Sequence, residues 1–173
     1  MNLRKKLFLT LLSGLLLGIP WSDSGLFLLV FVAWVPLLIL EEDLRHLSNP
    51  YTVFNYALVS FLLWNILGTW WIAKVQFVGA IFIIFANALL QASVFWLASR
   101  IRTTLGISLL FPFMFTWLAY EHLHLSWDLA WPWLNLGNAL ATAPEFIQWY
   151  AFTGVRGGTL WIILTNFAFL GLY

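Results

Sequence analysis

The stretch FVGAIFIIFANALLQASVFWLA, residues 77–98, decides the fold of this chain because it is long and apolar enough to cross a bilayer as one helix. Such a helix needs about 20 predominantly apolar residues. The run contains no charged residue. Its two amides, Asn87 and Gln91, are of the kind that hydrogen-bonds to neighbouring helices inside a membrane. We therefore predict that the rest of the chain packs around a membrane-spanning helix.

The composition of the whole chain supports this interpretation. Hydrophobic residues make up 62% of the 173 residues and charged residues only 9%, which is far from the averages of soluble domains. The eight basic residues are scattered and form no stripe that could follow a phosphate backbone, so we expect no nucleic-acid partner. The absence of cysteine excludes disulfides, thiolate metal sites and a cysteine nucleophile within this chain.

Other apolar segments indicate how many helices there are. They cover residues 7–19, 26–40, 53–72, 105–120 and about 159–173. We predict an all-α, polytopic transmembrane helical bundle of about six apolar segments, forming one domain over residues 1–173. The first two segments are short and suggest a helical hairpin that turns at residues 20–25, where Pro and Gly act as breakers. The basic start also fits a secretory signal, but no good cleavage site follows it. Pro112 is expected to kink the fifth segment.

The basic residues predict the orientation, because Lys and Arg near membrane spans are retained on the cytoplasmic side. With the N-terminus inside, six of the eight basic residues lie inside and two lie outside. The inner ones are Arg4, Lys5, Lys6, Arg45, Arg100 and Arg102, and the outer ones are Lys74 and Arg156. A long loop at about residues 121–158 then lies on the outer face, together with Asp23.

This outer loop contains WDLAWPWLNLG, residues 127–137. Trp and Tyr favour the membrane interface, so an aromatic belt accounts for Trp127, Trp149 and Tyr150. A belt explains WPWLNLG less well, because Pro132 fixes a bend and Asn135 and Gly137 supply a turn at a defined place.

The candidate substrate-binding residues gather at this outer level. They are Trp70, Trp71, Glu121, Trp131, Trp133, Asn135 and Gly137. Trp70 and Trp71 either line a groove with the loop or belong to the belt, and Glu121 is either an interfacial helix-end residue or a member of a polar site. His122 and His124 point to different sides of a helix. We predict no catalytic residue, no metal site and no cofactor in this chain.

Six stretches together resemble a known family. In order they are SGLLLGIPW (13–21), FVAWVPLLIL (31–40), GTWWI (68–72), WLAYEHL (117–123), WPWLNLG (131–137) and IQWYAFTGVRGGTLWIILTNFAFL (147–170). They resemble the N-terminal membrane part of bacterial apolipoprotein N-acyltransferases over nearly the whole chain. The most specific pieces are WPWLNLG and the series Gln148, Gly154, Val155, Gly157 and Asn166. Arg156 and Gly158 depart from the expected pattern.

The resemblance implies a function that this chain cannot perform alone. Enzymes of that family transfer an acyl chain from a membrane phospholipid to the N-terminal cysteine of a diacylglyceryl lipoprotein, at the outer face of the bacterial cytoplasmic (inner) membrane. Their chemistry belongs to a nitrilase-like domain with a Glu, Lys and Cys triad, which has no counterpart here. We therefore expect an inactive module that is a fragment of a longer chain. Its expected partners are the phospholipid, the lipoprotein and a nitrilase-like domain of the same gene or a separate subunit.

The same resemblance suggests a role for the outer loop. It would form the floor beneath the catalytic domain, with Trp70, Trp71, Trp131 and Trp133 lining a slot for lipid chains, while Glu121 and Asn135 hold the loop or contact headgroups. The alternative is a non-catalytic membrane scaffold or partner subunit of a separate enzyme. A small transporter is less favoured, because no span carries a buried charge pair and no two halves show matching broken helices.

Overall fold

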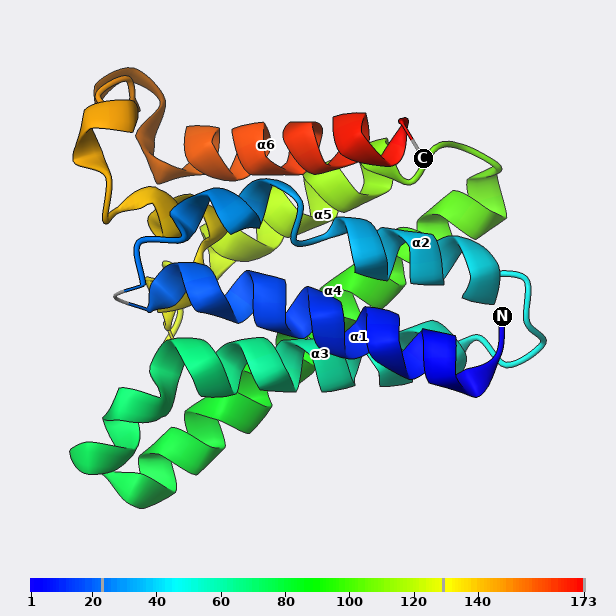
Figure 1. The fold of residues 1–173 in the computed structure, drawn as a ribbon, viewed down its shortest axis with the longest axis horizontal. Coiled ribbons are helices and arrows are strands. Elements are labelled where there is room, and N and C mark those ends of the chain that lie inside the picture. Colours follow the sequence, from blue (N-terminus) through cyan, green and yellow to red (C-terminus); the bar gives the residue numbers. More distant parts are fainter. Residues whose placement is uncertain (23, 129, 173) are drawn as a thin grey trace.

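The computed structural model describes residues 1–22, 24–128 and 130–172, and the expectation for Asp23 lies outside the described residues. The described part is all-helical, as predicted, and contains six α-helices packed as a bundle (Figure 1). They are α1 (Leu3–Gly18), α2 (Val35–Leu44), α3 (Tyr51–Thr69), α4 (Phe77–Leu105), α5 (Leu110–Leu123) and α6 (Tyr150–Leu170). Short 3-10 helices connect them: η1 (Ile19–Trp21), η2 (Phe27–Phe31), η3 (Trp70–Lys74), η4 (Pro132–Leu134), η5 (Leu136–Leu140) and η6 (Pro144–Phe146).

Two segments of the bundle are long and apolar enough to cross a membrane, namely Tyr51–Lys74 and Phe77–Leu105. The second contains the apolar run of residues 77–98 that predicted a membrane-spanning helix. It continues beyond the apolar run through Arg100 and Arg102 to Leu105, and Gly106 follows as its C-cap with a left-handed φ of 65°. Glycine adopts this conformation without a steric penalty, which makes it a common helix end.

The N-terminal hairpin is present, but its second arm is not one helix. Residues 26–40 are divided between η2 and α2. Pro36 lies in the first turn of α2, where its missing N–H costs no helical hydrogen bond. Trp34 lies just before α2, and its N–H donates to the side-chain oxygen of Asn166 on α6, at 2.9 Å. The hairpin is therefore anchored to the last helix of the bundle.

Two other expectations for the helices are corrected. Pro112 lies in the first turn of α5, where no intrahelical N–H bond exists to be broken, so it does not need to kink the helix. The last helix begins at Tyr150 rather than near Thr159, and Gly154 breaks its regular geometry with a φ of 64°. The sequence placed these helix ends from hydrophobicity alone, which does not report such turns.

Aromatic side chains fill the centre of the bundle. The ring of Trp34 lies 4.7 Å from Trp117 and 4.8 Å from Phe113, measured between centroids, and Phe61 and Trp64 pack around it. All five side chains are fully buried. Aromatic pairs at these distances add to the stabilisation from burial. This cluster ties α2, α3 and α5 together.

A chain of buried amides crosses the bundle beside these rings. The hydroxyl of Tyr120 donates to Asn87 at 2.7 Å, Asn87 donates to Asn65 at 2.8 Å, and Asn65 donates to Gln91 at 2.7 Å. The expected interhelical role of Asn87 and Gln91 is therefore confirmed, and Asn65 shares it. Asn55, another amide of α3, is exposed on the surface of that helix.

Candidate functional site

Glu121 lies in the last turn of α5, at the end of the bundle that carries the loop between α5 and α6. It is 0% exposed, and its carboxylate accepts hydrogen bonds from the indole of Trp117 at 3.1 Å, the backbone N–H of Leu136 at 2.8 Å and the hydroxyl of Thr159 at 2.7 Å. Among the described residues, no basic group forms an ion pair with it. Burial of a carboxylate is tolerable when hydrogen bonds compensate for lost water. Glu121 thus joins α5, η5 and α6 at one point.

Gly137 continues this junction on the loop side. Its N–H donates to the Thr159 hydroxyl at 3.1 Å, and its carbonyl accepts from the Tyr150 hydroxyl at 2.9 Å. A Cβ atom on Gly137 would lie only 2.1 Å from the carbonyl oxygen of Val155. Only glycine therefore allows the loop to approach α6 this closely.

The WPWLNLG segment is fixed by further hydrogen bonds to its main chain. Pro132 starts η4, and its carbonyl accepts from the side chain of Asn138 at 2.9 Å. The indole of Trp21 donates to the carbonyl of Trp133 at 3.1 Å. Asn135 is buried, with 6% exposed, and its carbonyl accepts from the N–H of Asn138 at 2.9 Å. Asn135 thus takes part in the turn through its backbone.

Three of the four predicted tryptophans meet above this framework. Trp71 lies edge-on to Trp133 at 5.4 Å and tilted toward Trp131 at 6.5 Å, measured between ring centroids. The indole of Trp133 donates to the carbonyl of Gly68 at 3.3 Å, yet 48% of the residue stays exposed. We call Trp71, Trp131 and Trp133 the tryptophan platform. Trp70 is not part of the platform. The ammonium group of Lys74 lies over its ring instead, 4.6 Å from the ring centroid.

The residues assigned to an aromatic belt are more closely bound than a belt requires. Tyr150 holds Gly137, as described, and Trp149 packs edge-on against it with centroids 4.8 Å apart. The indole of Trp127 donates to Nδ1 of His124 at 2.9 Å. Depth in a membrane does not specify such contacts, so these side chains also support the loop.

Sequence reasoning missed two residues that hold the site, Trp117 and Thr159. Both lie within stretches that resemble the family, 117–123 and 147–170, but nothing in the pattern distinguishes them. A threonine in an apolar helix ordinarily bonds its own preceding turn. Thr159 instead donates across the bundle to Glu121, and only the packing of α6 against the loop reveals this.

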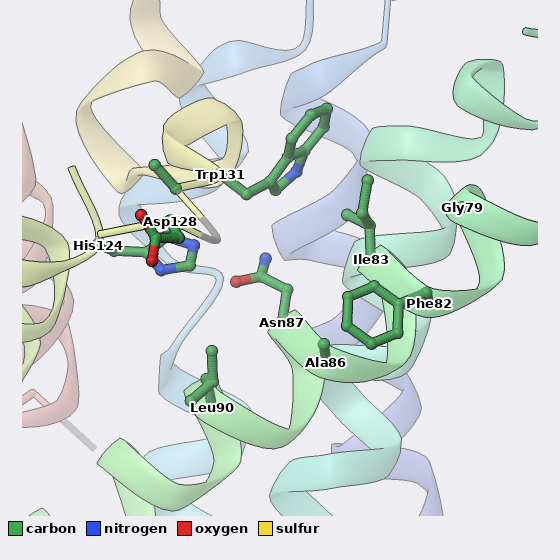
Figure 2. A pocket seen from close by; sticks show the side chains of 10 residues that line it. Gly79, Phe82, Ile83, Ala86, Asn87, Leu90, His124, Asp128 and Trp131 are labelled. Carbon is green, nitrogen blue, oxygen red and sulfur yellow. The ribbon is translucent and has the colours of Figure 1, made fainter. Parts of the chain in front are cut away.

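A cavity of about 310 Å³ opens beside the tryptophan platform, between α4 and the residues His124, Asp128, Ala130 and Trp131 (Figure 2). Trp131 from the loop, His124 from the end of α5, and Phe82 and Asn87 from α4 are among the residues that line it. Within the part of the chain that the structure describes, no group of three or more His, Asp or Glu side chains could hold a metal ion. The site offers an exposed aromatic surface and an apolar cavity, which suit binding.

Comparisons with known proteins identify the family. The family model for the apolipoprotein N-acyltransferase N-terminal domain matches residues 13–168. An apolipoprotein N-acyltransferase of Chlorobaculum tepidum is 32% identical over 172 residues, which cover 99% of this chain and 32% of that relative. The chain thus spans about a third of that relative's length, and no solved structure matches it significantly. This chain therefore belongs to the apolipoprotein N-acyltransferase family and carries its N-terminal domain.

Proposed function

We propose that the chain is the membrane-embedded N-terminal module of an apolipoprotein N-acyltransferase. It holds the phospholipid acyl donor and the lipoprotein acceptor beneath a nitrilase-like domain, which acylates the N-terminal cysteine of the lipoprotein. The module itself supplies binding and orientation. The nitrilase-like domain belongs to the same polypeptide or to a separate subunit.

The observation that carries this proposal is the tryptophan platform on its rigid support. Large aromatic rings are costly to leave in water and favour the level of lipid headgroups. Here the residues Trp71 and Trp133 remain 38% and 48% exposed, although hydrogen bonds of Glu121 on α5 and Thr159 on α6 fix the loop beneath them. A fixed and exposed aromatic surface beside a cavity is well suited to orient lipid chains for transfer.

The proposed location is a bacterial cytoplasmic membrane, with several passes and a cytoplasmic N-terminus. The N-terminus, the end of α2 and the end of α4 lie at one end of the bundle, and the loop lies at the other (Figure 1). The first end carries Arg4, Lys5, Lys6, Arg45, Arg100 and Arg102, and the other carries Lys74 and Arg156. This distribution agrees with the retention of basic residues inside. The platform then faces outward.

The proposal is tested by replacing Trp133 with alanine in the full-length enzyme and measuring acyl transfer to a diacylglyceryl peptide by mass spectrometry. We expect the transfer rate to fall at least tenfold, because the ring of Trp133 packs on Trp71 and faces outward. The unfolding temperature should fall only modestly, since about half of the residue is exposed and its indole makes one hydrogen bond, to the carbonyl of Gly68.

Trp70→Ala is the matched control, because Trp70 lies at the same level and is 53% exposed but packs against Lys74. Its transfer rate should stay within about twofold of the unmodified enzyme, the range expected for a surface substitution. Normal transfer by a well-expressed Trp133→Ala protein would contradict the proposal.

A further inference from the structure

Two histidines at the end of α5 hold neighbouring segments through the same ring nitrogen. The indole of Trp127 donates a hydrogen bond to Nδ1 of His124 at 2.9 Å. Two positions earlier, Nδ1 of His122 contacts the guanidinium group of Arg156 on α6. Side chains two residues apart on a helix face different sides. One contact therefore fixes the loop that follows α5, and the other fixes the first turns of α6.

The partners of the two rings assign their protonation state. An indole N–H and a guanidinium group can only donate hydrogen bonds. The Nδ1 atom that each of them contacts must therefore accept, so it carries no proton. A histidine with an unprotonated Nδ1 is neutral, and its single proton lies on Nε2. Both contacts thus require neutral rings.

The surroundings of His124 favour its neutral form. The residue is only 4% exposed, and this burial lowers the pKa of its ring. The backbone of Trp131 opposes the shift to a smaller extent. The ring of Tyr120 stacks on His124, with centroids 5.1 Å apart, and a tyrosine carries no charge in the range where histidine titrates. A proton added to His124 would therefore enter a site that is built for an uncharged ring.

The charged groups nearby do not remove this preference. Asp128 lines the same cavity as His124 and would attract a protonated ring, but it is exposed, so solvent screens the attraction. Arg156 would repel a protonated His122, and solvent also weakens this effect because the pair is exposed. The carboxylate of Glu121 is buried in its own hydrogen-bond network and contacts neither histidine. His124 therefore dominates the response to protons.

We propose that His122 and His124 form a proton-sensitive latch, which holds Arg156 and Trp127 while the rings are neutral and releases them in acid. On His124, a new N–H at Nδ1 would point at the N–H of Trp127. On His122, a positive ring would lie against a guanidinium group. Release would loosen the loop that carries Trp131 of the tryptophan platform. This inference goes beyond the proposed function, because the latch operates whether or not acyl transfer takes place.

The direction of the effect follows from proton linkage. His124 has a lower pKa in the closed latch than in the open one, so the open state binds more protons in acid. Closure is therefore fully favoured above about pH 6.5, the ordinary pKa of histidine, and weakens as the pH falls below it. At pH 5 the ratio of open to closed latch can rise at most about thirtyfold through this one residue.

The test is amide hydrogen exchange of the full-length protein in lipid nanodiscs, measured by mass spectrometry at pH 8 and pH 5. Each rate is divided by the intrinsic rate of an unfolded peptide at the same pH. We expect protection in peptides that contain Trp127 to fall about fivefold to thirtyfold at pH 5, and protection near Arg156 to fall less. Residues 3–12 contain no acid or histidine and should not change. Equal protection of the Trp127 peptides at both pH values would overturn the proposal.

Three substitutions identify the group that takes up the proton. His124→Asn keeps an acceptor near the position of Nδ1 but does not titrate, so the pH response should disappear. Trp127→Phe removes the donor from a residue that is 42% exposed, and its protection at pH 8 should already match that of the unmodified protein at pH 5. Glu121→Gln removes the other buried acid of this region and should keep the response. A response that persists in His124→Asn, full protection of Trp127→Phe at pH 8, or loss of the response in Glu121→Gln would overturn the proposal.

Discussion

The two ends of the bundle each bury a glutamate, and the two residues are stabilised differently. Glu41, 1% exposed, accepts from the Ser99 hydroxyl at 2.6 Å and pairs with Arg102. Glu121 is 0% exposed and accepts hydrogen bonds from neutral groups only. They are the Trp117 indole, the Leu136 backbone N–H and the Thr159 hydroxyl. Glu41 joins two helices, α2 and α4, whereas Glu121 joins a loop to the bundle.

The ion pair of Glu41 stabilises the packing of two helices, whereas the hydrogen bonds of Glu121 support the candidate site. An ion pair between helices holds them together without specifying the path of a loop. Hydrogen bonds to the N–H of Leu136 and, through Thr159, to the N–H of Gly137 specify that path directly. The tryptophan platform is built on the end that has the neutral network. Loss of Glu121 should therefore lower the rate of acyl transfer more than loss of the ion pair between Arg102 and Glu41.

The largest effect is expected for Glu121→Ala. It leaves the N–H groups of Leu136 and Trp117 buried and unpaired, at about 1–3 kcal/mol each, and it removes the hydrogen bond that holds the loop to α5. We expect a lower free energy of unfolding and faster amide hydrogen exchange across residues 131–140. Glu121→Gln is the matched control, because its carbonyl oxygen can still accept the first two bonds. Unchanged amide hydrogen exchange in the alanine variant would show that Glu121 does not hold the loop in place.

Arg102→Ala should have the next largest effect, at the other end. It leaves Glu41 buried without its cation, and breaking a buried pair costs about 3–5 kcal/mol. We expect the lower part of this range, because the Ser99 hydrogen bond remains and the pair lies near the helix end. Thermal unfolding in detergent measures the loss, and Arg102→Lys should restore part of it. Exchange across residues 131–140 should not change, and faster exchange there would mean that the two ends are not independent.

Gly137→Ala should have a smaller effect on stability but a clear effect on the loop. The added methyl group would clash with the Val155 carbonyl, so the loop must move, at about 1–3 kcal/mol. Gly171→Ala serves as the control, because its Cβ would meet no atom closer than 3.4 Å. Tryptophan fluorescence should shift in the Gly137 variant only. Identical spectra for both variants would show that the close approach at Gly137 does not hold the platform.

Much of the fold could be predicted from the sequence, because hydrophobic length and interrupting residues are local properties. The run at residues 77–98 indicated α4, and the two short runs indicated the N-terminal hairpin. The break before α2 could not be foreseen, since it depends on Asn166 accepting from Trp34, 132 positions away in the chain. The start of α6 was missed for a related reason, because Gly154 introduces a local bend.

The site was predictable in its composition but not in its contacts. WPWLNLG pointed to a shaped loop because proline and glycine restrict or permit particular backbone paths, and Glu121 stood out as an ionisable residue among apolar ones. The partner Thr159 and the separation of Trp70 from the platform depend on how α6 and η3 pack. Such contacts arise between distant segments and leave no periodic signal.

The central claim is that the network around Glu121 positions the tryptophan platform for acyl transfer. The most direct measurement is the transfer rate per folded molecule for Glu121→Ala and Arg102→Ala, both in the full-length enzyme at a temperature where each variant remains folded. The account predicts at least a tenfold loss for Glu121→Ala and a rate within about twofold of the unmodified enzyme for Arg102→Ala, since that change leaves the loop intact. Equal losses in the two variants would contradict it.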